Sequence, residues 1–270
     1  MEELESNSPP INTPRPAYPT IKQGMGLFGI TVLLQIGAAL LLGSLIAKNP
    51  SLGMLIVYVL VMGLSILFAW KMSERSTFSA GPFPLKLLPW VILLTPTIAL
   101  LMEPLIEALP YAAEFNEMML QAIGDNTTLA FLTVAVAAPL LEEVLFRGIV
   151  LDGFLKNYNP TKAIVWSAVI FGLVHLNPYQ FIPAFLIGLI MGWIYWKTGS
   201  LWLCILIHFI NNSAGFVLSW LVDSPLKEVQ STREMMSESG QYGMLLAGSA
   251  IILVFSLFML HKGMEEKIVV

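Results

Sequence analysis

The sequence is poor in charge. Only 12% of its 270 residues are charged, about half the fraction usual in soluble domains, whereas 56% are apolar. A water-soluble fold of this length would have too little polar surface to cover its core. The sequence also contains no run of Lys or Arg and no acidic tail. These absences exclude a soluble protein and a nucleic-acid partner, and they indicate that the protein is surrounded by membrane lipids.

Cysteine is nearly absent. The single cysteine, Cys204, excludes an intrachain disulfide framework and any CxxC metal or redox site. It lies within an apolar run, which predicts a small buried thiol. The first 21 residues are polar, contain five prolines, and lack the basic start and compact apolar core of a signal peptide. We therefore expect a disordered tail over 1–21, followed by a single transmembrane domain over 22–270.

Long apolar blocks of about 16–25 residues make up most of the chain, separated by short polar stretches. This pattern predicts the fold class: an all-α, polytopic integral membrane protein with about eight transmembrane helices. The predicted spans are 25–47, 52–72, 86–106, 128–151, 162–177, 180–197, 201–222 and 243–261. Pro89, Pro96 and Pro104 predict a kink or break in the third span. The fifth span is short and ends in a turn at Asn177 and Pro178.

The placement of Lys and Arg gives these spans an orientation. With both termini inside the cell, ten of these residues lie on inner segments and three on outer segments, and Arg147 is set aside because it lies within a span. The inner residues are Arg15, Lys22, Lys71, Arg75, Lys86, Lys156, Lys162, Lys197, Lys262 and Lys267, and the outer ones are Lys48, Lys227 and Arg233. The loop 107–127 has Glu107, Glu114, Glu117 and Asp125 but no Lys or Arg. Because cytoplasmic loops carry the excess of positive charge, both termini are predicted to be cytoplasmic.

A few ionisable residues lie within the predicted spans, where each charge costs at least about 2.5–3.5 kcal/mol. They are Glu103, Glu142, Glu143, Arg147, His175 and His208, accompanied by the amides of Asn211 and Asn212. Glu103 is expected at an interface or in a loop, and Asn211 is expected to bond between helices. His261, at the end of the last span, needs no functional explanation.

Helical geometry separates the two adjacent acids of the fourth span. Glu143 and Arg147 are four residues apart, so they share a face and are expected to form an ion pair. Glu142 is turned about 100° away and has no such partner in its own helix. Pro139, three residues earlier, is expected to free a backbone carbonyl near Glu142 and to bend the helix. One acid is thus predicted to be structural and the other free to face a cavity.

Two further helices carry polar residues at the same four-residue spacing. Phe171 and His175 share a face of the fifth span, and His208 and Asn212 share a face of the seventh. These residues and Glu142 are expected to converge on one cavity among spans four, five and seven. A carboxylate, two imidazoles and an amide provide a general base and an oxyanion donor, which suffices to activate water against an amide carbonyl.

At these residues the sequence resembles the CPBP family of intramembrane CAAX-type and bacteriocin-processing proteases. The family pattern is Glu-Glu-x-x-x-Arg, then Phe-x-x-x-His, then His-x-x-x-Asn. The three motifs occur here in order, at 142–147, 171–175 and 208–212, and the resemblance covers about 128–222. It implies hydrolysis of a peptide bond within or beside the membrane, in a peptide or protein substrate. Lipidated and bacteriocin-like substrates are the family's examples.

The resemblance also implies a role for each motif residue. Glu142 would be the general base, and His175 would help to hold the attacking water. His208 and Asn212 would stabilise the oxyanion. Glu143 and Arg147 would order the helix that carries Glu142, with Phe171 in a supporting position.

The question of a metal is open at this stage. Glu142, His175 and His208 form an acceptable zinc ligand set. However, the sequence lacks a His-Glu-x-x-His motif, in which one helix supplies two ligands and the base. If Glu142 bound the metal, another group would have to act as the base. A metal-free, glutamate-based site without a cofactor is therefore the favoured prediction, and zinc is the alternative.

Two other functions are compatible with the same residues. A proton-coupled transporter could use Glu142, His175 and His208 as a relay. Transporters often have matched repeats, whereas these polar residues crowd into spans four, five and seven, which favours the enzyme. A catalytically silent membrane scaffold is the third possibility. The predicted location is the bacterial inner membrane. From the assigned cytoplasmic ends, Glu142 and His208 lie about 11–14 Å deep but His175 about 20 Å. Helix tilt or a shifted end of the short fifth span would bring them level; otherwise one predicted span boundary is wrong.

Overall fold

The computed structural model describes residues 16–74, 79–110, 117, 126–221, 236 and 240–265. Every secondary-structure element in these residues is a helix. The helices are α1 Ile21–Lys48, α2 Pro50–Met72, η1 Leu85–Leu87, α3 Leu88–Glu107, α5 Thr127–Phe131, η2 Leu132–Ala137, α6 Ala138–Glu143, η3 Val144–Leu151, α7 Asp152–Asn157, α8 Pro160–Leu173, α9 Pro178–Thr198, α10 Leu201–Leu221 and α12 Gln241–Glu265. η1 is a 3₁₀-helix, and η2 and η3 are π-helical.

Each of the eight predicted spans coincides with a helix in the described part of the chain. Six of these helices are long and apolar enough to cross a membrane. The fold is therefore that of an all-α integral membrane protein. The other two are shorter: α8 has 14 residues, and the apolar part of α10 is Leu201–Ala214. At 1.5 Å per residue, α8 is about 21 Å long, less than the ~30 Å of a bilayer core.

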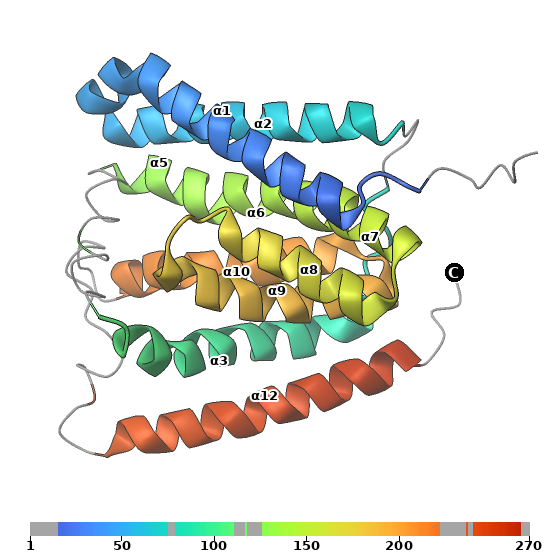
Figure 1. Cartoon of the computed structure of the whole chain (residues 1–270). Coiled ribbons are helices and arrows are strands. Elements are labelled where there is room, and N and C mark those ends of the chain that lie inside the picture. Colours follow the sequence, from blue (N-terminus) through green and yellow to red (C-terminus); the bar gives the residue numbers. More distant parts are fainter. Residues whose placement is uncertain are drawn as a thin grey trace, which may run out of the picture.

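The helices run alternately in opposite directions, as Figure 1 shows. The start of α1 and the end of α12 consequently lie at the same end of the bundle. Lys22, at the start of α1, and Lys262, near the end of α12, lie at this shared end. Lys48, at the end of α1, lies at the opposite end. This arrangement matches the predicted alternation, whereas the orientation in the membrane stays a prediction.

Several charged residues used for that orientation lie outside the described residues. They are Arg15, Arg75, Glu114, Asp125, Lys227, Arg233 and Lys267. The predicted tail is described from residue 16 onward. The side chain of Asn157 hydrogen-bonds to the backbone of Ala17 and Pro19. Helix α1 then begins at Ile21, with Thr20 as its N-cap.

The third predicted span is continuous from Leu88 to Glu107, so the expected break is wrong, whereas the expected kink stays a prediction. After η1, helix α3 runs through Pro96 and Pro104 to Glu107. The hydroxyl of Thr95 donates to the carbonyl of Val91, and that of Thr97 donates to Leu94. These hydroxyls bond to carbonyls on either side of Ile92, the residue whose carbonyl loses its donor at Pro96.

The fourth helix ends later than predicted, and this resolves the mismatch in depth. It continues through α7 to Asn157, whereas 151 was expected. Glu142 is thus 15 residues from its helix end, and His175 is 15 residues from the start of α8 at Pro160. At about 1.5 Å per residue, the two residues lie at similar depth.

The turn between α9 and α10 lies inside the protein, which accounts for the short distance from the start of α10 to His208. Ser200 and Leu201 are buried, and the backbone N–H of Leu201 donates to the carbonyl of Ala80. Gly81 packs so closely that an added Cβ would come within 1.9 Å of the carbonyl oxygen of Gly199. The segment 79–84 therefore covers this turn, and α10 starts below the surface.

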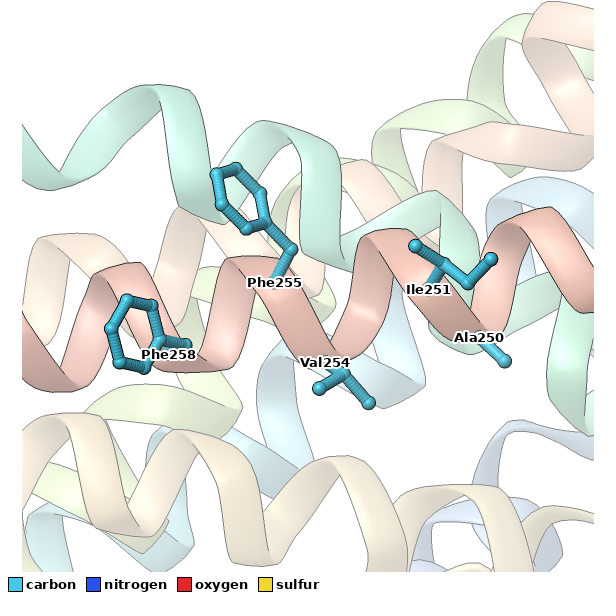
Figure 2. A pocket seen from close by; sticks show the side chains of 5 residues that line it. All are labelled: Ala250, Ile251, Val254, Phe255 and Phe258. Carbon is cyan, nitrogen blue, oxygen red and sulfur yellow. The ribbon is translucent and has the colours of Figure 1, made fainter.

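A shallow apolar hollow lies on α12, remote from the polar residues described below. Its lining is Ala250, Ile251, Val254, Phe255 and Phe258 (Figure 2). Phe255 points toward α3 and contacts the ring of Trp90 edge-on at 5.5 Å. The lining contains no ionisable group, as expected of a surface that faces lipid.

Candidate active site

The helix that carries the two glutamates is interrupted by π-helical turns on both sides. α6 ends at Glu143, η2 precedes it and η3 follows it. Every residue from Leu145 to Leu151 is buried, so this helix passes through the centre of the protein. π-helical turns are rare and occur mostly at functional sites. Here they rotate the residues of α6 relative to the flanking helix.

Pro139 explains part of this geometry. In η2 the N–H of Ala138 donates to the carbonyl of Thr133, five residues earlier. The next such bond would run from residue 139 to Val134, but proline has no N–H. Instead, the side-chain amide of Asn212 donates to the Val134 carbonyl at 2.9 Å. Pro139 thus leaves a backbone carbonyl without its helical donor, as predicted, and Asn212 binds it; the carbonyl is that of Val134, eight residues before Glu142.

Glu143 forms the predicted ion pair with Arg147. The distance from Nη1 of Arg147 to Oε1 of Glu143 is 2.8 Å, and both residues are buried. The same Oε1 also accepts a hydrogen bond from Nδ1 of His208, again at 2.8 Å. This second contact was not predicted, because it joins residues 65 positions apart. Glu143 therefore ties α6 to both η3 and α10.

Glu142 faces the other nitrogen of His208. Oε2 of Glu142 lies 3.9 Å from Nε2 of His208, too far for a direct hydrogen bond. A contact of this length is one that a water molecule can bridge. Oε1 of Glu142 accepts a hydrogen bond from the hydroxyl of Tyr58 on α2. The two carboxylates thus contact one imidazole from opposite sides of its ring.

Phe171 is the aromatic centre of the cluster. Its ring meets those of His175 and His208 edge-on, at 5.6 and 5.7 Å between centroids. The guanidinium of Arg147 lies over the same ring, 4.2 Å from its centroid. The phenylalanine therefore supports the cation that holds Glu143, and it connects His175 to the rest of the site.

His175 lies just beyond the end of α8, in the turn that leads to α9. Its Nδ1 contacts the carbonyl of Phe171 at 3.0 Å. The nearby turn is fixed by Asn177, which donates to the carbonyl of His175. Since Nδ1 binds a carbonyl oxygen, it carries the proton, and Nε2 is the nitrogen with a free lone pair in the neutral ring.

The structure therefore brings most of the predicted residues together. Glu142, Glu143, Arg147, Phe171 and His208 are joined by the contacts above. His175 reaches the cluster through Phe171, and Asn212 through the turn before α6. In the part of the chain that the structure describes, no three His, Cys, Asp or Glu side chains are close enough to hold a metal ion.

Tyr58 was missed by the sequence analysis, which considered only acids, bases and amides. A signal for it exists in the sequence. The other six tyrosines lie outside the predicted spans or within about three residues of a span end, whereas Tyr58 lies in the interior of the second span. A tyrosine away from the membrane interface needs a partner for its hydroxyl.

Comparison with known proteins matches one part of the chain to a family. Residues 124–214 match the model of the Rce1-like family, type II CAAX prenyl endopeptidases. All three motifs lie within the matched residues. This segment is similar to Rce1-like endopeptidases. The resemblance inferred from the motifs is confirmed, and α5 to α10 form the Rce1-like segment.

Curated relatives agree with this match. The chain is 30% identical over 117 residues to the membrane-embedded CAAX protease MroQ of Staphylococcus aureus, covering 41% of this chain and 46% of MroQ. It is 26% identical over 125 residues to YdiL of Bacillus subtilis, provisionally named a membrane peptidase, covering 45% of this chain and 51% of YdiL. An uncharacterized 24.3 kDa protein of Escherichia coli is 30% identical over 116 residues, or 41% and 53% of the two chains. The chain thus spans about half the length of these relatives. No solved structure matches it significantly.

Proposed function

We propose that the protein is an intramembrane endopeptidase that hydrolyses a peptide bond in a membrane-associated peptide or protein. The observation that carries this proposal is the placement of His208 between two carboxylates, with Glu143 at Nδ1 and Glu142 opposite Nε2. The match of residues 124–214 to the Rce1-like family supports the same activity. No observation favours the transporter or the scaffold.

The charges of the four ionisable residues in the cluster balance in the proposed reaction. The proposed reaction requires a proton on both ring nitrogens of His208; Arg147 and His208 then carry two positive charges, and Glu142 and Glu143 carry two negative ones. A neutral cluster avoids the cost of an uncompensated charge at this depth. A carboxylate that accepts a hydrogen bond from Nδ1–H stabilises the imidazolium, in which Nε2 is also a donor. His208 is then able to donate from Nε2 to a developing oxyanion.

In the proposed reaction Glu142 is the general base. Its Oε2 takes a proton from a water molecule as the oxygen of that water bonds to the carbonyl carbon of the substrate. Negative charge then develops on the carbonyl oxygen, where Nε2 of His208 donates a hydrogen bond. The contacts described use one of the two N–H bonds of Asn212, so the second is the further oxyanion donor. Glu142 returns the proton to the amine as the C–N bond breaks.

This mechanism needs no metal, and we propose that the site works without one. Glu142 serves as the base, so it is not a ligand. His175 is proposed to help hold the attacking water, with Phe171 fixing its ring. The enzyme is proposed to lie in the bacterial inner membrane with both termini in the cytoplasm. A lipidated substrate is proposed because residues 124–214 match CAAX prenyl endopeptidases and MroQ is named as a CAAX protease. A bacteriocin-like substrate is the alternative that the motif resemblance implies.

Cleavage of a fluorescence-quenched peptide library by the purified chain in detergent tests the proposal. We expect turnover by the wild type and none by Glu142→Gln, which keeps the size of the side chain and removes the base. A loss of about 10²–10⁴-fold is typical for a general base. Lys156→Ala, on the exposed surface of α7, is the control and should cleave like the wild type. Equal turnover by wild type and Glu142→Gln would refute the role of Glu142.

The same assay tests the absence of a metal. Incubation with a chelator should leave turnover unchanged. Activity that is lost to the chelator and restored by zinc would contradict the metal-free mechanism, whereas it would leave the peptidase activity itself intact.

A further inference from the structure

A residue outside the Rce1-like segment contacts the proposed base. Tyr58 lies on α2, 84 positions before Glu142 and far from the matched residues 124–214. Its hydroxyl donates a hydrogen bond to Oε1 of Glu142. Among the described residues, this is the one side-chain hydrogen bond that the carboxylate of Glu142 receives. The partner of the central acid therefore comes from a helix that none of the three motifs includes.

The contact determines which oxygen of Glu142 is available. A carboxylate has two equivalent oxygens and turns readily about its terminal torsion. With Oε1 bound to Tyr58, Oε2 is buried without a hydrogen-bond partner and lies 3.9 Å from Nε2 of His208. The free oxygen is thereby directed at the imidazole. Without the hydroxyl, no hydrogen bond among the described contacts would hold either oxygen of Glu142 in place.

Helix α2 is itself fixed in position. Ser51, seven residues before Tyr58, accepts a hydrogen bond from the backbone N–H of Asn126, which caps α5. Ser65, seven residues after it, accepts one from Thr31 of α1 at 3.0 Å. Residues seven apart lie on nearly the same face of a helix. Tyr58 is therefore placed between two polar anchors on one stripe of α2.

Close packing between α1 and α2 also fixes the position of α2. A Cβ added to Gly53 would come within 2.7 Å of the Cα of Ile46, so the two helices meet at backbone distance near their turn. Helix α2 also packs along α5, η2, α6 and η3. A tyrosine held by so many elements has little freedom to move relative to Glu142. Its rigid ring loses little entropy when it is fixed.

We propose that Tyr58 is a positioning residue: its hydroxyl holds Oε1 of Glu142 so that Oε2 faces the attacking water and His208. This inference rests on the proposed function, in which Glu142 is the base. The α1–α2 hairpin thereby completes the site of the Rce1-like segment. The segment alone supplies the reacting groups, and α2 supplies the orientation of one of them.

Kinetics of Tyr58→Phe on a peptide cleaved in the library assay test the proposal. The change removes one oxygen atom and keeps the ring. We expect kcat to fall roughly 10- to 100-fold with KM unchanged, because the base is misdirected while the substrate still binds. Tyr158→Phe is the matched control, since the Tyr158 hydroxyl accepts a hydrogen bond from the N–H of Ile21, the first residue of α1, and does not contact Glu142. It should leave kcat and KM unchanged.

A second measurement does not depend on activity. Tyr58→Phe should lower the thermal midpoint of the full chain in detergent, and it should have no further effect in a Glu142→Ala background, because the bond is already lost. Equal effects in the two backgrounds would overturn the proposal. So would unchanged or increased kcat in Tyr58→Phe while Glu142→Gln is inactive. Turnover by Glu142→Gln would instead refute the proposed function, independently of Tyr58.

Discussion

At the scale of single residues, the site depends on how two adjacent acids are separated. Glu143 is fully buried and binds Arg147 and His208, whereas Glu142 binds Tyr58 and keeps one oxygen free. The four-residue spacing predicted the Arg147 pair. The contact with His208 depends on how α10 packs on α6. Glu143 consequently links α6 to both η3 and α10. Its loss should lower the stability of the protein more than the loss of Glu142.

Glu143→Ala is expected to lower the free energy of unfolding by about 3–5 kcal/mol, because Arg147 would be left as a buried, unpaired charge. The thermal midpoint in detergent measures this. Lys156→Ala is the control: it breaks the pair between Lys156 and Asp152, which is also at four-residue spacing but exposed, and it should cost less than about 1 kcal/mol. If Glu142→Ala destabilised the protein and Glu143→Ala did not, the paired and free acids would be assigned the wrong way round.

At the scale of elements, prolines have different effects in the third and fourth spans. Helix α3 continues through Pro96 with hydroxyls of neighbouring threonines bonded to its backbone. The fourth span instead contains two π-helical turns, and a side chain from α10 binds the carbonyl that Pro139 leaves open. The Rce1-like segment therefore uses Asn212 to hold the turn before Glu142.

A double-mutant cycle on Pro139 and Asn212 tests this arrangement. Asn212→Ala alone should cost about 1–3 kcal/mol of stability, because the Val134 carbonyl loses its donor. In a Pro139→Ala background the cost should be smaller, since position 139 then carries an N–H that can bind this carbonyl. Thermal unfolding of the four proteins measures the coupling. Additive effects would show that the two residues act independently.

At the scale of the whole molecule, the bundle is organised by alternating helices that place the start of α1 and the end of α12 at the same end of the bundle (Figure 1). Lys262 and Lys48 lie at opposite ends of the bundle and are both exposed. The turn that starts α10 is covered by the segment 79–84, which lies at the same end as Lys262. The predicted orientation makes this the cytoplasmic end.

Thiol labelling of intact cells tests the orientation, in a Cys204→Ser background. Lys48→Cys should react with a membrane-impermeant reagent, whereas Lys262→Cys should react only after permeabilisation, because the positive-inside rule assigns Lys262 to the cytoplasm. Labelling of both variants after permeabilisation is the control for accessibility. The reverse pattern in intact cells would invert the predicted topology.

The sequence by itself determined the class of protein and the residues of the motifs. Charge is scarce and apolar blocks are long, so only helices that satisfy their own backbone could form. Periodicity then placed Arg147 on the same face as Glu143, and His175 next to Phe171 although His175 lies just beyond the end of α8. Span ends were less well predicted, as at Asn157, because polar residues there continue the helix beyond the apolar block.

Only the tertiary structure decided the contacts between helices. The bonds from His208 to Glu143, from Asn212 to Val134 and from Tyr58 to Glu142 each join distant residues. Helix periodicity indicates which face a residue occupies, but not which neighbouring helix packs on that face or in what register. That choice depends on close approaches such as Gly53 against Ile46, summed over the bundle. The local sequence therefore specifies the chemical groups of the site, and the packing of the whole bundle specifies how these groups are arranged.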